Sequence, residues 1–232
     1  MPLPSLGRKR LRPCAITMIT DIHTHNTVST DGIICTTPHS FSPLPGKFYS
    51  CGIHPWETAG TGNDDIGKLC RILARPEIAA IGETGIDRLK GAPATRQEEL
   101  LRMHIALSER FRKPLIIHEV KAADIILAIH RQTKPKMPWI RHGFRGNAQT
   151  ARMYWSKGIY LSVGEKFNAE AVASIPEALL LLETDESRLS IYEIAGQVAK
   201  ARQTTMEAMI ELSARNISAL LDSCHPLSYK CN

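Results

Sequence analysis

Two histidines placed two residues apart, His23 and His25, begin a series of residues whose side chains commonly bind metal ions. They end the apolar run Ile-Thr-Met-Ile-Thr-Asp-Ile, which predicts a buried strand, and residues two apart in a strand face the same side. Both imidazoles can therefore point from the end of that strand toward one cation. Similar candidates recur where later apolar runs stop, namely Glu83, His118, His142 and Asp185. This repetition favours a metallohydrolase.

The acidic residues of the series divide into ligands and supporting groups. Glu83 follows Ala-Ile-Gly in a run expected to be buried, where an unpaired carboxylate would be costly, so a cation is its natural partner. Asp87 is expected to fix a loop or a neighbouring ligand instead of binding metal. Glu183 and Asp185 are two residues apart, so in a strand both side chains can face the interior, and Glu183 can support the site.

The other histidines differ in their setting. His54 ends the run Phe-Tyr-Ser-Cys-Gly-Ile, and we expect it to contact a phosphate or to donate a proton to the leaving oxygen. A structural role beside Pro55 is the alternative. His104 lies on a helical stripe, which predicts a packing or surface role. No setting that indicates chemistry surrounds His39, His130 and His225.

The elements that must position these residues alternate between short apolar runs and longer helical patterns. Strands are predicted at residues 16–22, 33–36, 48–53, 78–82, 115–117, 139–141, 159–162 and 179–183. Helices are predicted at residues 64–75, 95–112, 122–131, 147–157, 192–202 and 205–221. Eight strands, each leading into the next by such a crossover, predict an α/β fold, a TIM-like (β/α)8 barrel. Its strand ends converge on one face, where the candidate residues would meet.

Residues 26–47 depart from this alternation. They contain Pro38, Pro43, Pro45 and Gly46, and they have room for one short strand but no full helix. The first crossovers of the barrel are therefore expected to be shortened to loops. No internal repeat, low-complexity tract or linker divides the chain, which predicts one hydrolase domain over residues 18–222 and a C-terminal tail over 223–232.

The net charge of +6 is concentrated near the start of the chain, where Arg8, Lys9, Arg10 and Arg12 supply four positive charges. Residues 1–17 are predicted to be a disordered basic extension, because no separate apolar segment of a signal peptide precedes the first strand. A loose tail or an upstream start is favoured over a functional basic arm. The nearly neutral remainder, without a basic and aromatic tract, argues against strong binding of nucleic acid.

Six cysteines show no CxxC pair and no spacing of a small secreted domain, which predicts a reduced, cytoplasmic protein. Cys224, His225 and Cys231 lie at a polar C-terminus and are not expected to bind a metal. No apolar run approaches the roughly 18 residues that would indicate a membrane span. No feature indicates an obligate protein partner.

Six short motifs together resemble the successive signatures of the TatD-type family of metal-dependent hydrolases, and they occur in the order of that family. Each motif alone is weakly specific, whereas six in order over about residues 18–221 are specific. The motifs are Asp21-Ile-His-Thr-His25, Gly52-Ile-His-Pro-Trp56, Ala80-Ile-Gly-Glu-Thr-Gly-Ile-Asp87, Pro114-Leu-Ile-Ile-His118, His142-Gly-Phe-Arg-Gly146 and Leu182-Glu-Thr-Asp185.

The resemblance implies a barrel with a binuclear metal centre and a phosphodiesterase or deoxyribonuclease activity. Carried over to this chain, His23, His25 and Asp185 hold one metal, His118 and His142 hold the other, and Glu83 bridges them. Two cations ~3.5–4 Å apart lower the pKa of a water and stabilise charge on the attacked phosphoryl group. Asp185 beside that water is the candidate general base, so Asp185, Glu83 and His54 are the expected catalytic residues.

The expected cofactors are two divalent metal ions. Four imidazole ligands favour Zn, Mn or Fe over Mg because imidazole is the softer donor, whereas the family resemblance implies Mg or Mn. Zn, Mn and Mg therefore all stay open.

The chain departs from the family around the substrate pocket. Glu119-Val-Lys121 follows His118, where a small and then a basic residue are usual, so Lys121 is expected to take the phosphate role and Glu119 to add a negative charge. Arg88 stands where an aromatic residue is usual. Together with His54, Lys121 and Arg145 are the expected substrate-binding residues, and specificity is the property that these departures put in question.

The leading hypothesis is a divalent-metal-dependent phosphodiesterase or deoxyribonuclease that resembles a 3′-end exonuclease and acts on DNA ends or a small phosphoester. One alternative is hydrolysis of another small ester or amide on the same metal face, because a fold does not fix a function. Another is a non-catalytic nucleic-acid-binding descendant, which would predict lost ligands, although all six are present.

Overall fold

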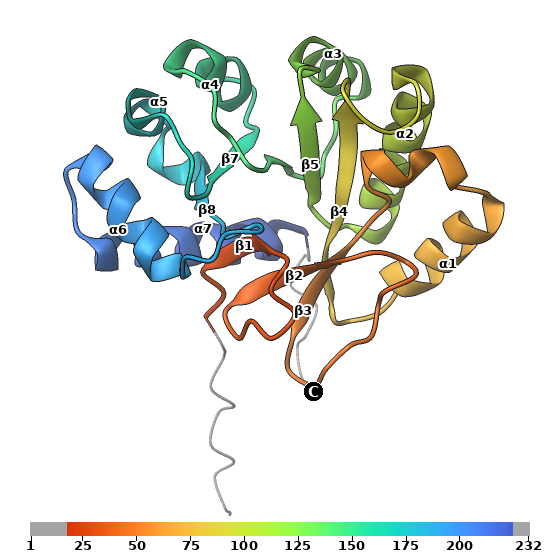
Figure 1. Ribbon diagram of the computed structural model, residues 1–232, viewed down its shortest axis with the longest axis horizontal. Helices are drawn as coiled ribbons and strands as arrows, with labels where there is room; N and C mark the ends of the chain where they lie inside the picture. The colour runs from red at the N-terminus through yellow and green to blue at the C-terminus, as the bar shows by residue number, and fades with distance from the viewer. Residues whose placement is uncertain (1–17, 225–232) are drawn as a thin grey trace, which may run out of the picture.

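The computed structural model describes residues 18–224, and they form eight parallel strands that pair in chain order around a barrel (Figure 1). A single bridge between Thr24 and Asp185 joins the last segment to the first strand, so the barrel is nearly closed. The strands are β1 (Asp21–Thr24), β2 (Gly32–Thr36), β3 (Phe48–Cys51), β4 (Ile78–Asp87), β5 (Leu115–Val120), β6 (Trp139–Arg141), β7 (Tyr160–Val163) and β8 (Leu180–Leu182).

Helices follow the strands from β3 onward, as the sequence predicted, with two 3-10 helices and one short α-helix that the apolar spacing did not reveal. The unforeseen elements are η1 (Pro55–Gly60), α5 (Ala169–Ser174) and η2 (Glu177–Leu179). Their six residues or fewer are too short to produce a helical period. The predicted helices are α1 (Asn63–Leu73), α2 (Ala94–Phe111), α3 (Ala123–Thr133), α4 (Ala148–Trp155), α6 (Ile191–Arg202) and α7 (Met206–Cys224).

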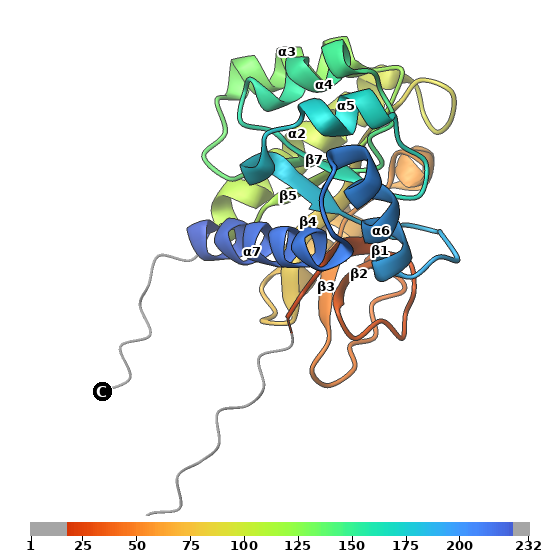
Figure 2. The ribbon, with the colours of Figure 1, turned by 90° about the vertical axis from the view of Figure 1, so that its left-hand side faces the viewer.

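The first two crossovers are loops, which confirms the prediction for residues 26–47. Between residues 24 and 48, β2 is the only regular element, and no helix separates β1 from β2 or β2 from β3. Helices α2 to α5 lie on the side of the barrel opposite the loops around β2 and β3 (Figures 1 and 2). The crossovers from β1 to β2 and from β2 to β3 therefore add no helix to the outer ring of the barrel.

The interior of the barrel is filled by one apolar side chain from each of several strands. Ile33, Ala80, Ile116, Ile140 and Leu181 are fully buried and form one cluster, which α7 completes with Ile217 and Leu220. Helix α7 is also fixed to the strands by polar contacts, because the hydroxyl of Ser213 donates to the Thr20 carbonyl and accepts from the Leu182 amide. A packed floor of this kind supports the strand ends above it.

Several strand boundaries differ from the prediction by one to three residues, and two differ by more. The first strand was predicted to begin at residue 16, and residues 16 and 17 lie outside the described residues. In the described part β1 begins at Asp21, which the register places opposite Gly32, the first residue of β2. Strand β4 continues to Asp87 because it stays paired with β5 as far as Val120. Glu83 is thus in the middle of a long strand.

Helix α7 extends to Cys224, so residues 223 and 224 belong to it and not to the predicted tail. The predicted basic extension over 1–17 and the residues from His225 onward lie outside the described residues. Among residues 18–224, no helix combines the length and the apolar character needed to cross a membrane.

Candidate metal centre

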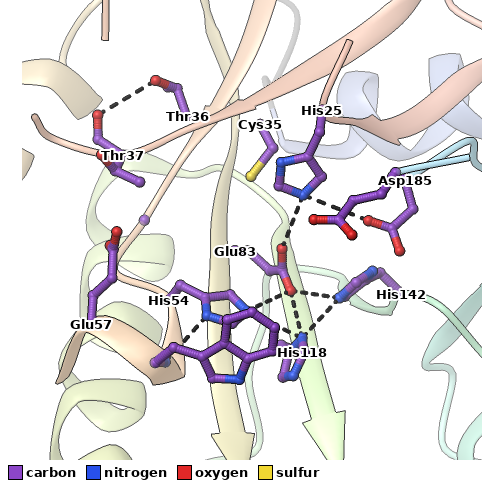
Figure 3. Close-up of a pocket in the computed structure, with 13 residues that line it drawn as sticks. His25, Cys35, Thr36, Thr37, His54, Glu57, Glu83, His118, His142 and Asp185 are labelled. Carbon is purple, nitrogen blue, oxygen red and sulfur yellow. Dashed lines mark hydrogen bonds and ion pairs between the residues drawn. The ribbon is translucent and has the colours of Figure 1, made fainter. Parts of the chain in front are cut away.

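The candidate residues meet at the carboxyl ends of the strands, around a pocket of about 270 Å³ (Figure 3). Five of the six predicted ligands line this pocket, and the sixth, His23, is completely buried beside it. The predicted catalytic residue His54 also lines the pocket. The other lining residues are Cys35, Thr36, Thr37, Gly52, Trp56, Glu57 and Glu186.

Glu83 lies at the centre of the cluster, with its two carboxylate oxygens directed at different histidines (Figure 3). Oε1 is 2.6 Å from Nδ1 of His118 and 2.8 Å from Nε2 of His142. Oε2 is 3.3 Å from Nε2 of His23 and 3.6 Å from Nε2 of His25. A carboxylate whose two oxygens face different pairs of histidines is arranged as a bridge between two cations would require.

Asp185 completes the set on the His23 side. Its Oδ1 atom lies 3.7 Å from Nε2 of His23 and 3.6 Å from Nε2 of His25. The sequence resemblance assigned these three residues to one metal and His118 with His142 to the other. The structure brings all of them together around Glu83, with His142 also close to His23 and Asp185.

Several imidazole nitrogens of the cluster have no hydrogen-bond partner among the described residues. They are both ring nitrogens of His23, Nε2 of His118 and Nδ1 of His142, all of them inaccessible to solvent. A buried polar atom without a partner costs roughly 1–3 kcal/mol. Of these atoms, Nε2 of His23 faces Glu83 and Asp185, and a cation there would remove the cost at this nitrogen, so the donor set fits a divalent metal ion.

The electrostatics of the cluster also depend on close pairing. Burial opposes ionisation of Glu83, but His142, His118 and His23 outweigh burial and hold the pKa of this carboxyl well below its usual range. Burial likewise disfavours charge on His142, yet Glu83 and Glu183 raise its pKa to about 10. The pKa of Asp185 is raised by burial and by the charge of Glu183. Negative charge is thus crowded into the pocket.

Two buried carboxylates stand behind the candidate ligands, as expected for supporting residues. Glu183 accepts a hydrogen bond from the amide of Gly143 at 2.6 Å and lies 3.6 Å from Nδ1 of His142. Asp87 accepts a hydrogen bond from the indole of Trp56 at 2.7 Å and lies 3.5 Å from Nε2 of His118. Each imidazole therefore has a carboxylate at the nitrogen that faces away from Glu83, an arrangement that orients metal-binding histidines.

The backbone near the barrel seam holds β1 and Asp185 together. Asp185 has a positive φ of 52°, and its amide donates to the His23 carbonyl while its own carbonyl accepts from the His25 amide. Asp21 links the same segments, because its carboxylate accepts from the amides of His23 and Thr184. No role was predicted for Asp21, because its contact depends on a residue 163 positions away in the chain.

Glycines beside Glu83 allow neighbouring backbones to approach. A side chain at Gly85, which has φ +147°, would place its Cβ 1.9 Å from the carbonyl oxygen of His118. A Cβ at Gly52 would lie 2.7 Å from the Glu83 carbonyl oxygen. Only glycine fits these positions, so these two motif glycines set the spacing between β4 and β5, which carry Glu83 and His118, and between β4 and the segment that leads to His54.

His54 has its tautomer fixed by the 3-10 helix that follows it. Its Nδ1 atom accepts a hydrogen bond from the Trp56 amide, so in the neutral ring the proton is on Nε2. Nε2 lies 3.1 Å from Oε1 of Glu83 and faces the pocket. His54, Glu83 and His118 are close enough to share an ion, but a protonated nitrogen donates a hydrogen bond and does not bind a metal.

The predicted substrate residues are placed unevenly. Arg145 lines a hollow of about 210 Å³ that adjoins the centre through Asp185, together with Lys166, which the sequence did not single out. Lys121 is exposed and lines neither this hollow nor the central pocket. Arg88 donates a hydrogen bond to Asp124 at 2.8 Å and is directed toward α3.

Glu119 does not add its charge to the site, which corrects the expectation for this residue. Strand alternation directs it away from the interior that His118 faces. Its carboxylate accepts from the side chains of Arg141 at 3.1 Å and Tyr154 at 2.8 Å, and from the Ala122 amide. The negative charge of Glu119 is therefore paired with Arg141 on the outer side of the strands, away from the metal centre.

Several lining residues received no role from the sequence reasoning, and two of them matter most for the chemistry of the site. Cys35 on β2 was treated as an ordinary cysteine because it has no partner cysteine at metal-binding spacing. Trp56 in η1 is 49% exposed, and its ring is held by the bond to Asp87 while Nζ of Lys90 lies 4.0 Å from the ring centroid. An exposed, fixed aromatic ring after His54-Pro55 is the signal that could have been used.

Comparison with known proteins gives consistent results. The family model for TatD-related DNases matches residues 42–222. The uncharacterized metal-dependent hydrolase YabD of Bacillus subtilis is 27% identical over 195 residues, which are 75% of this chain and 76% of YabD. YcfH of Escherichia coli K12, also an uncharacterized metal-dependent hydrolase, is 29% identical over 197 residues, 74% of this chain and 72% of YcfH.

The same fold occurs in a solved structure. The crystal structure of YJJV, a TatD homologue from Escherichia coli K12, superimposes with a TM-score of 0.75 at 19% identity, covering 92% of this chain and 100% of YJJV. This similarity confirms the predicted barrel.

Proposed function

Because this chain belongs to the family of TatD-related DNases and is a metal-dependent hydrolase, we propose that it hydrolyses phosphodiester bonds at the ends of DNA strands. The observation that carries the proposal is the position of Glu83, whose two carboxylate oxygens face separate imidazole pairs. We assign His23, His25 and Asp185 to one cation, His118 and His142 to the other, and Glu83 to both.

The bound ions, which we take to be Zn, Mn or Mg, would activate a water molecule and neutralise charge on the attacked phosphoryl group. The side chains around them divide the remaining work. The carboxylate of Asp185, 25% exposed at the mouth of the pocket, is placed to accept a proton from water. The Nε2–H group of His54 is placed to donate a hydrogen bond to a phosphoryl or leaving oxygen.

The surroundings of the pocket favour a strand end or a small phosphoester over a long duplex. Trp56 presents an exposed ring at the rim, on which one base can stack, and such stacking is worth about 1–3 kcal/mol per base. Arg145 and Lys166 in the adjoining hollow can contact one neighbouring phosphate. A long duplex would gain little more, because Arg88 already pairs with Asp124.

Hydrolysis of a carboxylic ester or an amide is the second candidate, and the charge of the pocket favours it. No lysine or arginine is among the residues that line the central pocket, whereas Glu57 and Glu186 add two carboxylates to its rim. A substrate with one negative charge or none would be repelled less than a polyanion.

A substrate panel decides between these candidates. Metal-free protein is reloaded separately with Zn, Mn and Mg and assayed on a 3′-single-stranded oligonucleotide, its duplex, a chromogenic phosphodiester, and a chromogenic ester and amide, each at low and high salt. We expect the single-stranded end and the small phosphodiester to be cleaved fastest, with weak salt dependence.

A duplex cleaved fastest, with a steep loss in salt, would contradict the preference for strand ends. Turnover of the ester or amide alone would move the enzyme to the second candidate. Absence of turnover on the whole panel, with metal bound, would support a binding protein without catalysis.

A further inference from the structure

Strand β2 also contributes a side chain to the layer that forms the metal centre. This side chain is not among the assigned ligands. In three strands, the residue two positions after an interior apolar residue belongs to the cluster or supports it, because alternate residues share a face. His118 follows Ile116, His142 follows Ile140 and Glu183 follows Leu181. Cys35 follows Ile33 in the same way, so β2 directs its thiol into this layer.

The thiol of Cys35 lies within reach of the ligands on the His23 side. Its sulfur, one ring nitrogen each of His23 and His25, and a carboxylate oxygen of Glu83 all lie within 4.8 Å of one another. Cys35 also lines the central pocket, and its sulfur lies beside His25 and Glu83 (Figure 3).

His23 gives independent evidence that this group of atoms has a ligand. The imidazole is 0% exposed, and its Nε2 atom makes no hydrogen bond among the described residues although it faces Glu83 Oε2 at 3.3 Å. Imidazole, carboxylate and thiolate are all donor types that Zn²⁺ binds in proteins.

We propose that Cys35 is a sulfur ligand of the cation held by His23 and His25, and that it biases this position toward Zn²⁺ or Co²⁺ over Mg²⁺. The inference rests on the metal centre assigned above. When the sulfur–metal bond forms, the S–H bond breaks and its proton passes to solvent. Thiolate sulfur is a soft donor, whereas Mg²⁺ prefers oxygen, so the preference for the softer ion follows.

The second cation position has no such residue. His118, His142 and Glu83 form it without a cysteine, and of the four described cysteines, all of them free, only Cys35 lines the pocket. The two positions are therefore expected to differ in their preferred metals.

Cobalt titration of the metal-free protein tests the proposal without reference to turnover. A thiolate bound to Co²⁺ produces a charge-transfer absorption in the near ultraviolet, and Co²⁺ in any N/O site produces ligand-field bands in the visible. We expect both in the unaltered protein and in Cys70→Ser, which alters a partly buried thiol on α1 as a matched control. In Cys35→Ala we expect the ligand-field bands to stay and the charge-transfer band to vanish.

Affinity measurements extend the test. Cys35→Ala should weaken binding of the first Zn²⁺ by about tenfold or more and leave the Mg²⁺ affinity within about twofold. Far-ultraviolet circular dichroism checks that each variant folds, and Cys35→Ser provides a second variant of nearly equal size.

Ligand-field bands without a charge-transfer band in the unaltered protein would overturn the role of Cys35 and leave the metal centre standing. Persistence of the band in Cys35→Ala would also overturn it. Absence of all cobalt bands would reject both the role of Cys35 and the metal centre.

Discussion

Buried polar side chains gather in two regions of this barrel, the metal centre and the contact between α2 and the strands beside it. In the second region the buried side chains of Gln97, His104, Ser108 and Lys113 all have protein partners. His104 donates from Nδ1 to the Leu100 carbonyl at 2.7 Å and accepts at Nε2 from the Ile53 amide at 3.0 Å. Lys113 donates to three carbonyl oxygens, those of Leu73, Arg75 and Ile78.

In the metal centre, His23, Glu83 and His142 are as deeply buried, but imidazole nitrogens are left without hydrogen bonds, among them both nitrogens of His23. The pKa values of the two regions also move in opposite directions. Burial lowers the pKa of His104 to about 4, whereas at His142 the carboxylates of Glu83 and Glu183 outweigh burial and raise the pKa to about 10. A histidine satisfied by the backbone holds the fold together, and one facing carboxylates with a free nitrogen indicates a ligand that is not protein.

The largest effect is expected from Asp185→Asn. Asparagine tolerates the positive φ at this position and keeps the size of the side chain, so the barrel seam should be retained. It removes the proton acceptor and a charged ligand, and we expect kcat/KM to fall by about a thousandfold or more. Steady-state kinetics on the best substrate of the panel measure this, with a urea midpoint as the check on stability. A fall of less than about tenfold would remove Asp185 from the chemistry.

The second prediction concerns metal-linked stability. A cation that binds only the folded protein stabilises it by about 2.7 kcal/mol at a free concentration of 100 times its Kd. We expect Zn²⁺ or Mn²⁺ to raise the urea midpoint of the metal-free protein and Glu83→Gln to lose most of that gain. Elemental analysis should also find less than the full metal content in this variant.

His104→Gln is the matched control from the contact between α2 and its neighbouring strands, where the buried polar side chains named above are hydrogen-bonded to protein. It should lower the stability with and without metal by the same amount, because His104 contacts backbone groups and no candidate ligand. An unchanged metal stoichiometry in Glu83→Gln would contradict the bridging assignment.

Strand-end positions made the metal centre predictable. His118 and His142 each end an apolar run, and a barrel brings such ends together whatever lies between them. The same reasoning predicted the missing crossover helices, because the prolines of residues 26–47 exclude a helix locally.

Contacts between distant residues were not predictable in this way. Cys35 belongs to the site because of the register in which β2 pairs with its neighbours. The spacing of residues near Cys35 in the sequence does not reveal this register. Glu119 was misread because sequence adjacency to His118 was given more weight than strand alternation, which separates the two side chains. The tautomer of His54 depends on an amide in a helix too short to be recognised from a period.

The third prediction is that His104, in the contact between α2 and its neighbouring strands, makes the stability of the protein depend on pH. The pKa of His104 falls from 6.5 to about 4 on folding, so the unfolded chain binds the proton first as the pH decreases. The stability due to the neutral ring is present above pH 6.5 and is lost as the pH falls toward 4. Between pH 7 and pH 5 this amounts to about 2 kcal/mol.

Urea unfolding of the metal-free protein at these two pH values measures the loss. His104→Gln should be less stable at pH 7 and should lose about 2 kcal/mol less than the unaltered chain on acidification. Equal losses in both proteins would mean that His104 is charged in the folded state, and the contrast between the two regions would then fail.

The smallest effect is expected from His54→Ala, which tests the residue that shares features of both regions. One nitrogen of His54 is satisfied by the Trp56 amide, as in the α2 region, and the other faces Glu83 in the pocket. Because the pocket-facing nitrogen carries the proton, its removal should cost a substrate contact and no metal. We expect kcat/KM to fall by about tenfold with metal content unchanged, whereas parallel loss of metal and activity would make His54 a ligand. His54→Gln, whose amide can place an N–H group toward the pocket, should recover part of the activity if donation of a hydrogen bond is the function of this side chain.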